Sequence, residues 1–100
     1  MDIEIKRNGG AITAFLSGRM DTPAASEAAA VLLPLQEEDA ESITLDCTDL
    51  SYISSSGLRI FLALRKASAE KGWKLVVKNI NDSIRNVFMM TGFLNLFQII

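Results

Sequence analysis

Apolar and polar residues alternate in two short stretches near the start of the chain. Ile3 and Ile5 stand between charged residues, and apolar residues recur at every second position in the segment 11–17. A period of two is that of a β-strand with one buried face. The dipeptide Asn8-Gly9 between the stretches is a strong turn signal, because both residue types accept positive φ. The pattern therefore predicts a β-hairpin. The buried face of its second strand is expected to carry Ile12, Ala14 and Leu16.

A helix is expected to follow the hairpin. Thr22 can cap it and Pro23 suits its first position, and an Ala-rich stretch then runs to about residues 34–36. The acidic segment 37–41 predicts a solvated loop. Beyond it, alternating apolar residues from Ile43 to Cys47 predict a third strand, with the Cys47 thiol on its buried face.

Three consecutive serines, Ser54, Ser55 and Ser56, stand where a polar turn after this strand gives way to a second helix. A hydroxyl at a helix start can cap the helix by accepting a hydrogen bond from an unpaired backbone N–H. It can also accept a phosphoryl group, which the helix dipole then helps to hold. Capping is the commoner role of serines at such positions.

The second helix is expected over residues 55–71, because apolar residues recur there with helical period and a glycine follows. Its inward stripe is expected to be Ile60, Phe61, Leu64 and Ala67, and its outward side Arg59, Lys66 and Glu70. A short strand over residues 74–78 follows, and its three central apolar residues predict burial on both faces.

A third helix is expected to begin with Asp82 or Ser83 as its cap and to end at Gly92. One side of this helix carries Ile84, Val87, Phe88 and Thr91. Residues 97–100 can add an edge strand. The element order is then β-β-α-β-α-β-α-β. This order predicts one α/β domain over residues 1–100, with helices packed on a mixed, mostly parallel β-sheet.

Charge and hydropathy narrow the classes of partner. The formal net charge of the 100 residues is -2, and lysine and arginine do not cluster, so no nucleic-acid surface is expected. No apolar run has the length of a membrane span, and no basic segment precedes an apolar one at the start of the chain. We therefore expect a cytoplasmic protein that does not insert into membranes.

The sequence also offers little for catalysis. It contains no histidine, so a Ser-His-Asp triad cannot form, and it shows no metal or cofactor site. Ser68 and Lys71 match a Ser-x-x-Lys pattern, but they lie within the second predicted helix and the rest of that signature is missing. The protein is therefore not expected to be an enzyme.

Three motifs at compatible spacing resemble the STAS domain. They are the serine turn continuing through Gly57 and Leu58, the earlier Gly18-Arg19-Met20-Asp21, and the segment 87–93. In particular they resemble the stand-alone anti-sigma factor antagonists of bacteria. The resemblance implies a regulator that binds an anti-sigma factor. That partner is often also a kinase, which phosphorylates a residue at the start of the second helix, and a phosphatase reverses the step.

By its position in the motif, the phosphorylated residue maps onto Ser55, with Ser54 and Ser56 as alternatives. Ser54 stands where the family usually has an aspartate. The resemblance also leaves a second role open, that of a small cytosolic STAS-type subunit of an ABC lipid transporter without a phosphorylation switch.

A partner surface is expected around this serine turn. The residues assigned to it are Asp21, Ser54, Ser56, Gly57, Leu58, Arg59, Leu62 and Met89. Arg59 lies in the first helical turn, within reach of a phosphate, and Asp21 and Asp49 are expected near the same sheet edge. Leu58, Leu62 and Met89 would form an apolar docking patch, although for the two leucines the margin of a wide core face is the favoured interpretation.

Overall fold

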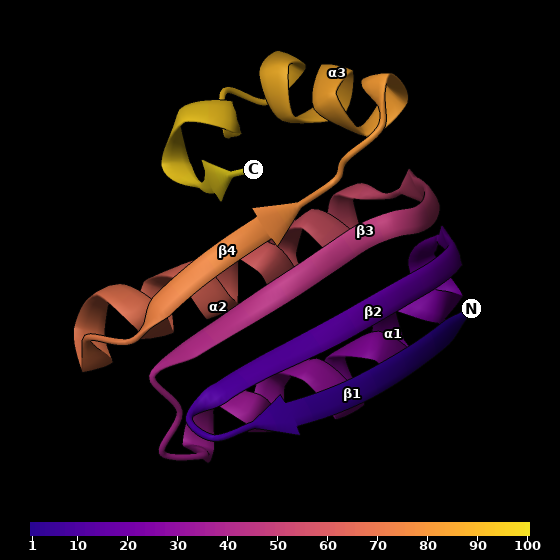
Figure 1. The fold of residues 1–100 in the computed structure, drawn as a ribbon. Helices are drawn as coiled ribbons and strands as arrows, with labels where there is room; N and C mark the ends of the chain where they lie inside the picture. The colour runs from indigo at the N-terminus through magenta and orange to yellow at the C-terminus, as the bar shows by residue number, and fades with distance from the viewer.

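The computed structural model describes all residues 1–100 and contains one five-stranded sheet with strand order β1-β2-β3-β4-β5 (Figure 1). In chain order the elements are β1 (Asp2–Asn8), β2 (Ala11–Met20), α1 (Thr22–Leu32), β3 (Ser42–Ile53), α2 (Ser55–Lys71), β4 (Lys74–Lys78), α3 (Asp82–Met90) and β5 (Gln98–Ile99). Strand β1 pairs with β2 antiparallel, and all other neighbours are parallel. The predicted element order and mixed α/β fold are confirmed.

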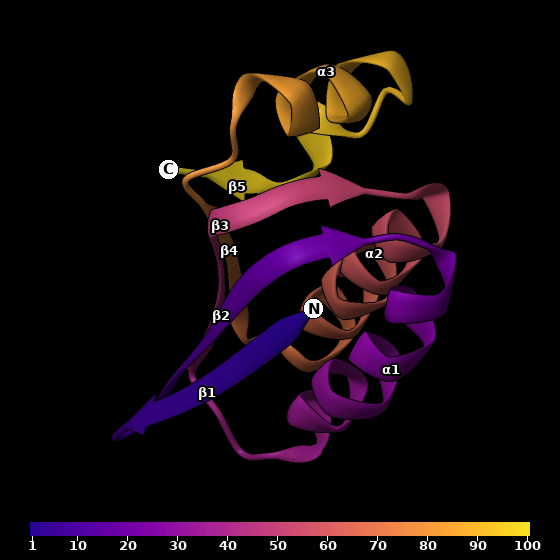
Figure 2. The same ribbon diagram turned by 90° about the vertical axis from the view of Figure 1, so that its right-hand side faces the viewer.

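Helices α1 and α2 lie on the same side of the sheet, and the opposite face carries no helix (Figure 2). Helix α3 has a different position, beside the far half of β3. Strand β4 pairs only with residues 42–46, so it leaves the later part of β3 without a neighbour on that side. Helix α3 lies near this part, and the side-chain amide of Asn81 donates to the carbonyl of Leu50 at 3.2 Å.

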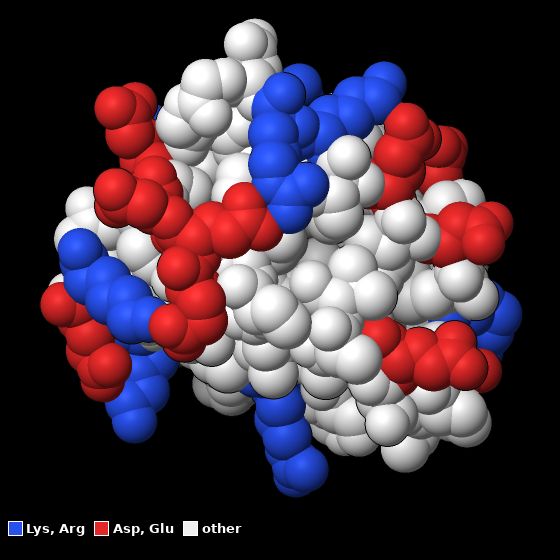
Figure 3. Space-filling view, turned by 90° about the horizontal axis from the view of Figure 1, so that it is seen from below, with Lys and Arg blue, Asp and Glu red and all other residues white.

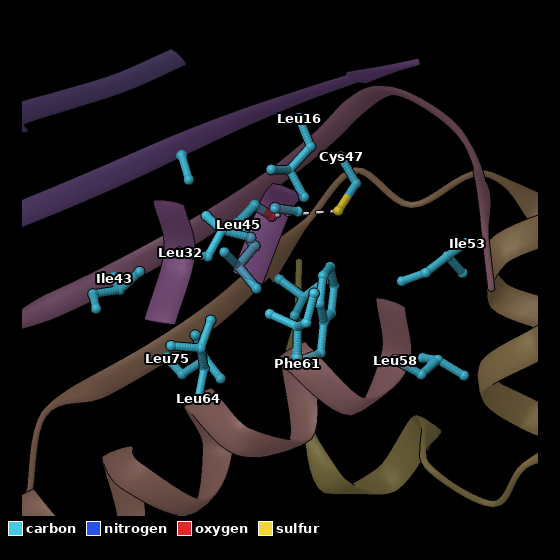
Figure 4. Close-up of a cluster of buried hydrophobic side chains, with 14 of the residues drawn as sticks. Leu16, Leu32, Ile43, Leu45, Cys47, Ile53, Leu58, Phe61, Leu64 and Leu75 are labelled. Atoms are coloured by element: carbon cyan, nitrogen blue, oxygen red, sulfur yellow. Dashed lines mark hydrogen bonds between the residues drawn. The ribbon is translucent and has the colours of Figure 1, made fainter. Parts of the chain in front are cut away.

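The core fills the space between the sheet and helices α1 and α2. The stripe predicted for α2 is buried in full, as are Ile12, Ala14 and Leu16 of β2 and all three central residues of β4. Figure 4 shows Phe61 and Leu64 of α2 beneath the strands, with Leu45 and Cys47 above them. The predicted burial of Cys47 is confirmed, and its Sγ donates to the carbonyl of Leu45 at 3.6 Å.

Strands β2 and β3 are longer than predicted. The alternation of apolar and polar residues predicts strand ends at Ser17 and Cys47, but the strands continue to Met20 and Ile53. The register shifts twice along this pair, so the regular period of two is lost while pairing goes on. The predicted polar turn before the serines is therefore wrong, because residues 48–53 belong to β3.

Two helix caps also differ from the predictions. Asp21, not Thr22, caps α1, and its Oδ1 accepts from the backbone N–H of Ala24 at 3.0 Å. Asn81, not Asp82 or Ser83, caps α3 through a bond from the N–H of Ile84 at 2.8 Å. The helical ends at Gly72 and Gly92 are as predicted, with φ of 84° and 77°.

The acidic segment is partly ordered by ion pairs. A short 3₁₀ helix over Leu33–Glu37 extends α1 into it. Arg7 Nε donates to Glu38 Oε1 at 2.8 Å, and Lys71 Nζ lies 3.4 Å from Glu37 Oε1. Acidic and basic side chains are interspersed on the end of the molecule shown in Figure 3. None of the helices combines the length and the hydrophobicity that crossing a lipid bilayer requires.

Candidate functional site at the start of helix α2

The serine turn lies where two parallel strands end side by side. Met20, the last residue of β2, pairs with Ile53, the last residue of β3. The N–H of Ser54 donates to the carbonyl of Met20 at 2.8 Å, which ties the two strand ends together. Each strand passes directly into a helix, capped by Asp21 in one case and by Ser54 in the other. Helices α1 and α2 therefore begin next to each other, at the carboxyl ends of β2 and β3.

Ser54 is the structural serine of the three. It is only 9% exposed and has extended backbone angles. Its Oγ accepts a hydrogen bond from the N–H of Gly57 at 3.2 Å, and its carbonyl accepts from the N–H of Leu58 at 3.0 Å. Ser54 is thus the N-cap of α2, and its hydroxyl is already used.

Ser55 and Ser56 have different surroundings. Ser55, the first residue of α2, is exposed. Ser56 is half-buried and faces a hollow of about 290 Å³ between the two helices, which Thr22 and Ser26 of α1 also line. Of the three adjacent hydroxyl groups, the one on Ser55 is therefore the most accessible to another protein.

The electrostatics of this site favour an anion. The first backbone N–H groups of a helix have no partner within it, and the helix dipole adds a partial positive charge. Arg59 in the first turn is exposed and forms no ion pair. The Asp21 carboxylate lies on the neighbouring strand end, but one of its oxygens is bound to the start of α1.

The structure changes the predicted partner surface. Leu58 is only 2% exposed and belongs to the same buried cluster as Ile53 and Phe61 (Figure 4), so its assignment to an exposed docking patch is wrong. Gly57 is buried as well, and a Cβ at this position would come within 2.7 Å of Met20 Sδ. Leu62 is half-buried against the core, whereas Met89 is 57% exposed. The part of the surface that stays accessible is smaller than predicted.

Three exposed side chains near the ends of these elements were not predicted. Arg19 and Tyr52 pair across β2 and β3, and the guanidinium carbon lies 4.4 Å from the centre of the tyrosine ring. Met90 at the end of α3 is 88% exposed. Tyr52 falls in the predicted polar turn. The alternation of exposed Tyr52 with buried Ile53 can be recognised only once β3 is known to continue through both residues. Asp49 lies opposite Ser17, four positions before the end of β3, so it is further from the serines than Asp21.

Comparisons with known proteins agree with this fold. The family model of the STAS domain matches residues 2–100. The chain is 26% identical over 99 residues to the anti-sigma-B factor antagonist of Bacillus subtilis, covering 99% of this chain and 90% of that protein. It is 28% identical over 100 residues to the protein of the same name from Listeria monocytogenes, covering 99% and 88%.

Solved structures show the same fold at lower identity. The anti-sigma factor antagonist SpoIIAA in its unphosphorylated form is similar with a TM-score of 0.82 at 17% identity, covering 99% of this chain and 88% of that one. The phosphorylated form of the Bacillus cell fate determinant SpoIIAA gives a TM-score of 0.76 at 17% identity, covering 99% and 91%. With its element order, its serine turn and a family match over nearly its whole length, the chain belongs to the STAS domain family.

Proposed function

We propose that this protein is an anti-sigma factor antagonist, a non-catalytic regulator that acts in the cytoplasm and is switched by phosphorylation of Ser55. In the unmodified state it binds an anti-sigma factor and so frees a sigma factor. The partner, or a kinase associated with it, transfers a phosphoryl group to Ser55, and a phosphatase removes it. The names of the relatives support the binding role, and the exposure of Ser55 beside a hydroxyl already used as a cap supports the switch.

The switch acts on the partner surface and leaves the fold intact. A phosphoserine adds about -1.5 to -2 charges and three acceptor oxygens. At the first position of α2 this group meets free N–H groups and the positive end of the helix dipole, so it is well tolerated by the protein itself. For a partner that contacts the same place, the added charge and bulk weaken binding.

The accessible residues around Ser55 form the proposed docking surface. Arg59 and Met89 are exposed, and Asp21, Ser56 and Leu62 are half-buried. Arg59 is also a candidate for contact with the phosphate, because it lies one turn along the same helix. Ser54 and Gly57 contribute through the backbone geometry of the turn, since both are buried.

The experiment is co-purification of the tagged chain from its native cells, followed by incubation of the recovered complex with ATP and Mg²⁺. Intact-mass measurement should show one added phosphate, and the modified protein should leave the complex. Ser55→Ala should remain unmodified and bound. Ser56→Ala, the matched control one position along, should be modified as the parent is.

Two results would contradict the proposal. Phosphate found on Ser56 or Ser54 instead of Ser55 would place the switch at another hydroxyl. Recovery of transporter subunits, with no phosphate added, would favour the second role that the family resemblance allows. Thermal unfolding of Ser55→Glu followed by circular dichroism distinguishes a loss of binding from a loss of fold. The melting temperature of this variant should be close to that of the parent protein.

A further inference from the structure

The sheet face without helices has a hollow of about 240 Å³ between β2 and β3. It is lined by Phe15 and Leu16 from β2 and by Asp46, Thr48 and Asp49 from β3. Phe15 and Asp46 are direct neighbours in the parallel register. Phe15 leaves 37% of its surface exposed. The hollow therefore combines an accessible aromatic ring with two carboxylates.

Asp46 is a carboxylate with an incomplete set of partners. It is only 8% exposed, and its Oδ1 accepts from the backbone N–H and the hydroxyl of Thr48 at 3.0 and 2.6 Å. Its Oδ2 has no hydrogen bond, and no cation lies within 4.0 Å. Only one side-chain polar atom, Trp73 Nε1, is both sealed from solvent and without a hydrogen bond. The unpaired Oδ2 of Asp46 is therefore not sealed, and it is open to the hollow that Asp46 lines.

Such a carboxylate is built to receive a cation. One of its oxygens is held by Thr48, and a positive group at the free oxygen would form a charge-assisted hydrogen bond in a partly desolvated place. Lysines are near but do not supply it. Lys78 neighbours Asp46 on β4 without forming an ion pair, and Lys6 Nζ lies 5.5 Å from the centre of the Phe15 ring. The position of Lys6 shows that a cation can rest over this ring.

We propose that this hollow receives an arginine side chain of a protein partner. A guanidinium group is planar, stacks on aromatic rings and forms paired hydrogen bonds with carboxylates, which matches Phe15, Asp46 and Asp49 together. The hollow is smaller than the roughly 300–1,000 Å³ of pockets that enclose small molecules. Its size and its place on an open sheet face fit one anchoring side chain of a larger surface.

The test is an NMR titration of the isolated, ¹⁵N-labelled chain with N-acetyl-arginine amide. The amide signals of Phe15, Thr48 and Asp49 should shift, with saturation at about millimolar concentration, as expected for a fragment with few contacts. N-acetyl-norleucine amide, the uncharged probe of similar length, should leave these signals unchanged. The isolated chain is used and Ser55 is not involved, so the outcome is independent of the proposed phosphorylation.

Variants then separate this site from general charge attraction. Asp46→Asn keeps an acceptor for Thr48 but removes the charge, and should weaken binding about tenfold. Asp49→Asn should weaken it about threefold, as for an exposed pair. Asp82→Asn, an exposed carboxylate on α3, is the control and should have no effect. The proposal is overturned if no signals shift, if Asp82→Asn weakens binding as much as Asp46→Asn, or if spermidine binds more tightly than the arginine probe, which would indicate a free polyamine.

Discussion

Replacing Ser54 by alanine should destabilise the protein, although the neighbouring serine can be replaced without cost. Loss of a serine N-cap typically costs about 1 kcal/mol. In Ser54→Ala the N–H of Gly57 loses its acceptor, and because Gly57 is buried, water cannot easily take the place of the lost hydroxyl. An unsatisfied buried donor moves the expected cost towards about 2 kcal/mol. For a chain of this size, each 1 kcal/mol lowers the melting temperature by about 4–8 °C.

Urea unfolding measures this difference directly. Trp73 is the single tryptophan and is buried, so its fluorescence reports the loss of the core, and circular dichroism reports the helices. Coincident transitions from the two probes would justify a two-state free energy. Ser55→Ala is the matched control and should unfold within about 0.5 kcal/mol of the parent. Ser54→Asp keeps a capping acceptor and should recover most of the stability lost in Ser54→Ala.

The reasoning is refuted if Ser54→Ala unfolds at the same urea concentration as the parent. It is equally refuted if Ser55→Ala loses as much stability as Ser54→Ala. In the first case the 3.2 Å bond to Gly57 would contribute nothing to the fold. In the second case the exposed hydroxyl would be structural, and its release for phosphorylation would be in doubt.

Three further predictions follow from other parts of the structure. Burial raises the pKa of the Cys47 thiol to about 12, so a thiol reagent at pH 8 should label it only after denaturant is added. Gly57→Ala should lower the free energy of unfolding in urea by about 1 kcal/mol. The new Cβ would come within 2.7 Å of Met20 Sδ, and this overpacking outweighs the gain in helix propensity. A variant more stable than the parent would contradict this packing. The hydrogen bond from Arg7 lowers the pKa of Glu38. The stabilisation that this pair gives to the folded state is therefore present near neutral pH and is lost as the pH falls through the lowered pKa. Parent and Glu38→Gln should therefore differ in stability at neutral pH and converge in acid, and since the pair is exposed, 1 M salt should reduce the difference.

The sequence was sufficient for the fold because its periodicity is regular where the packing is regular. Alternation located β1, the first part of β2 and the first part of β3, and helical period located α2 with four of its buried residues. Glycines marked both helix ends where φ is positive, at Gly72 and Gly92. These features are local, so they can be recognised without knowing which segments meet.

The errors arose where a local pattern depends on a distant partner. Strand β3 continues past Cys47 because β2 pairs with it through two register shifts, and these shifts break the period of two. The position of the cap of α1 depends on where the preceding strand ends. Asp21 and Thr22 can both cap a helix, and the end of β2 at Met20 decides between them.

The docking patch was overestimated for the same reason. Helical phase gives the direction of Leu58 but does not reveal which distant segments bury it. One such segment is α3, whose Phe88 lies 6.1 Å from Phe61 of α2, centroid to centroid. The exposed pair of Arg19 and Tyr52 was missed because it requires the extended β3. The predicted exposure of Met89 is confirmed, because it lies on the side of α3 away from the buried residues Ile84 and Phe88.

Three adjacent serines are equivalent in the sequence, and the structure gives each different surroundings. The Ser54 hydroxyl is buried and holds the first turn of α2, and Ser56 faces α1. Ser55 is the exposed member of the group and takes no part in the cap, so a phosphate there would change the surface without breaking the cap. A regulatory serine needs this separation, because a group that held the helix could not be modified without loosening it. Stability and partner binding should therefore respond to different serines, with Ser54→Ala affecting the first and Ser55→Glu the second.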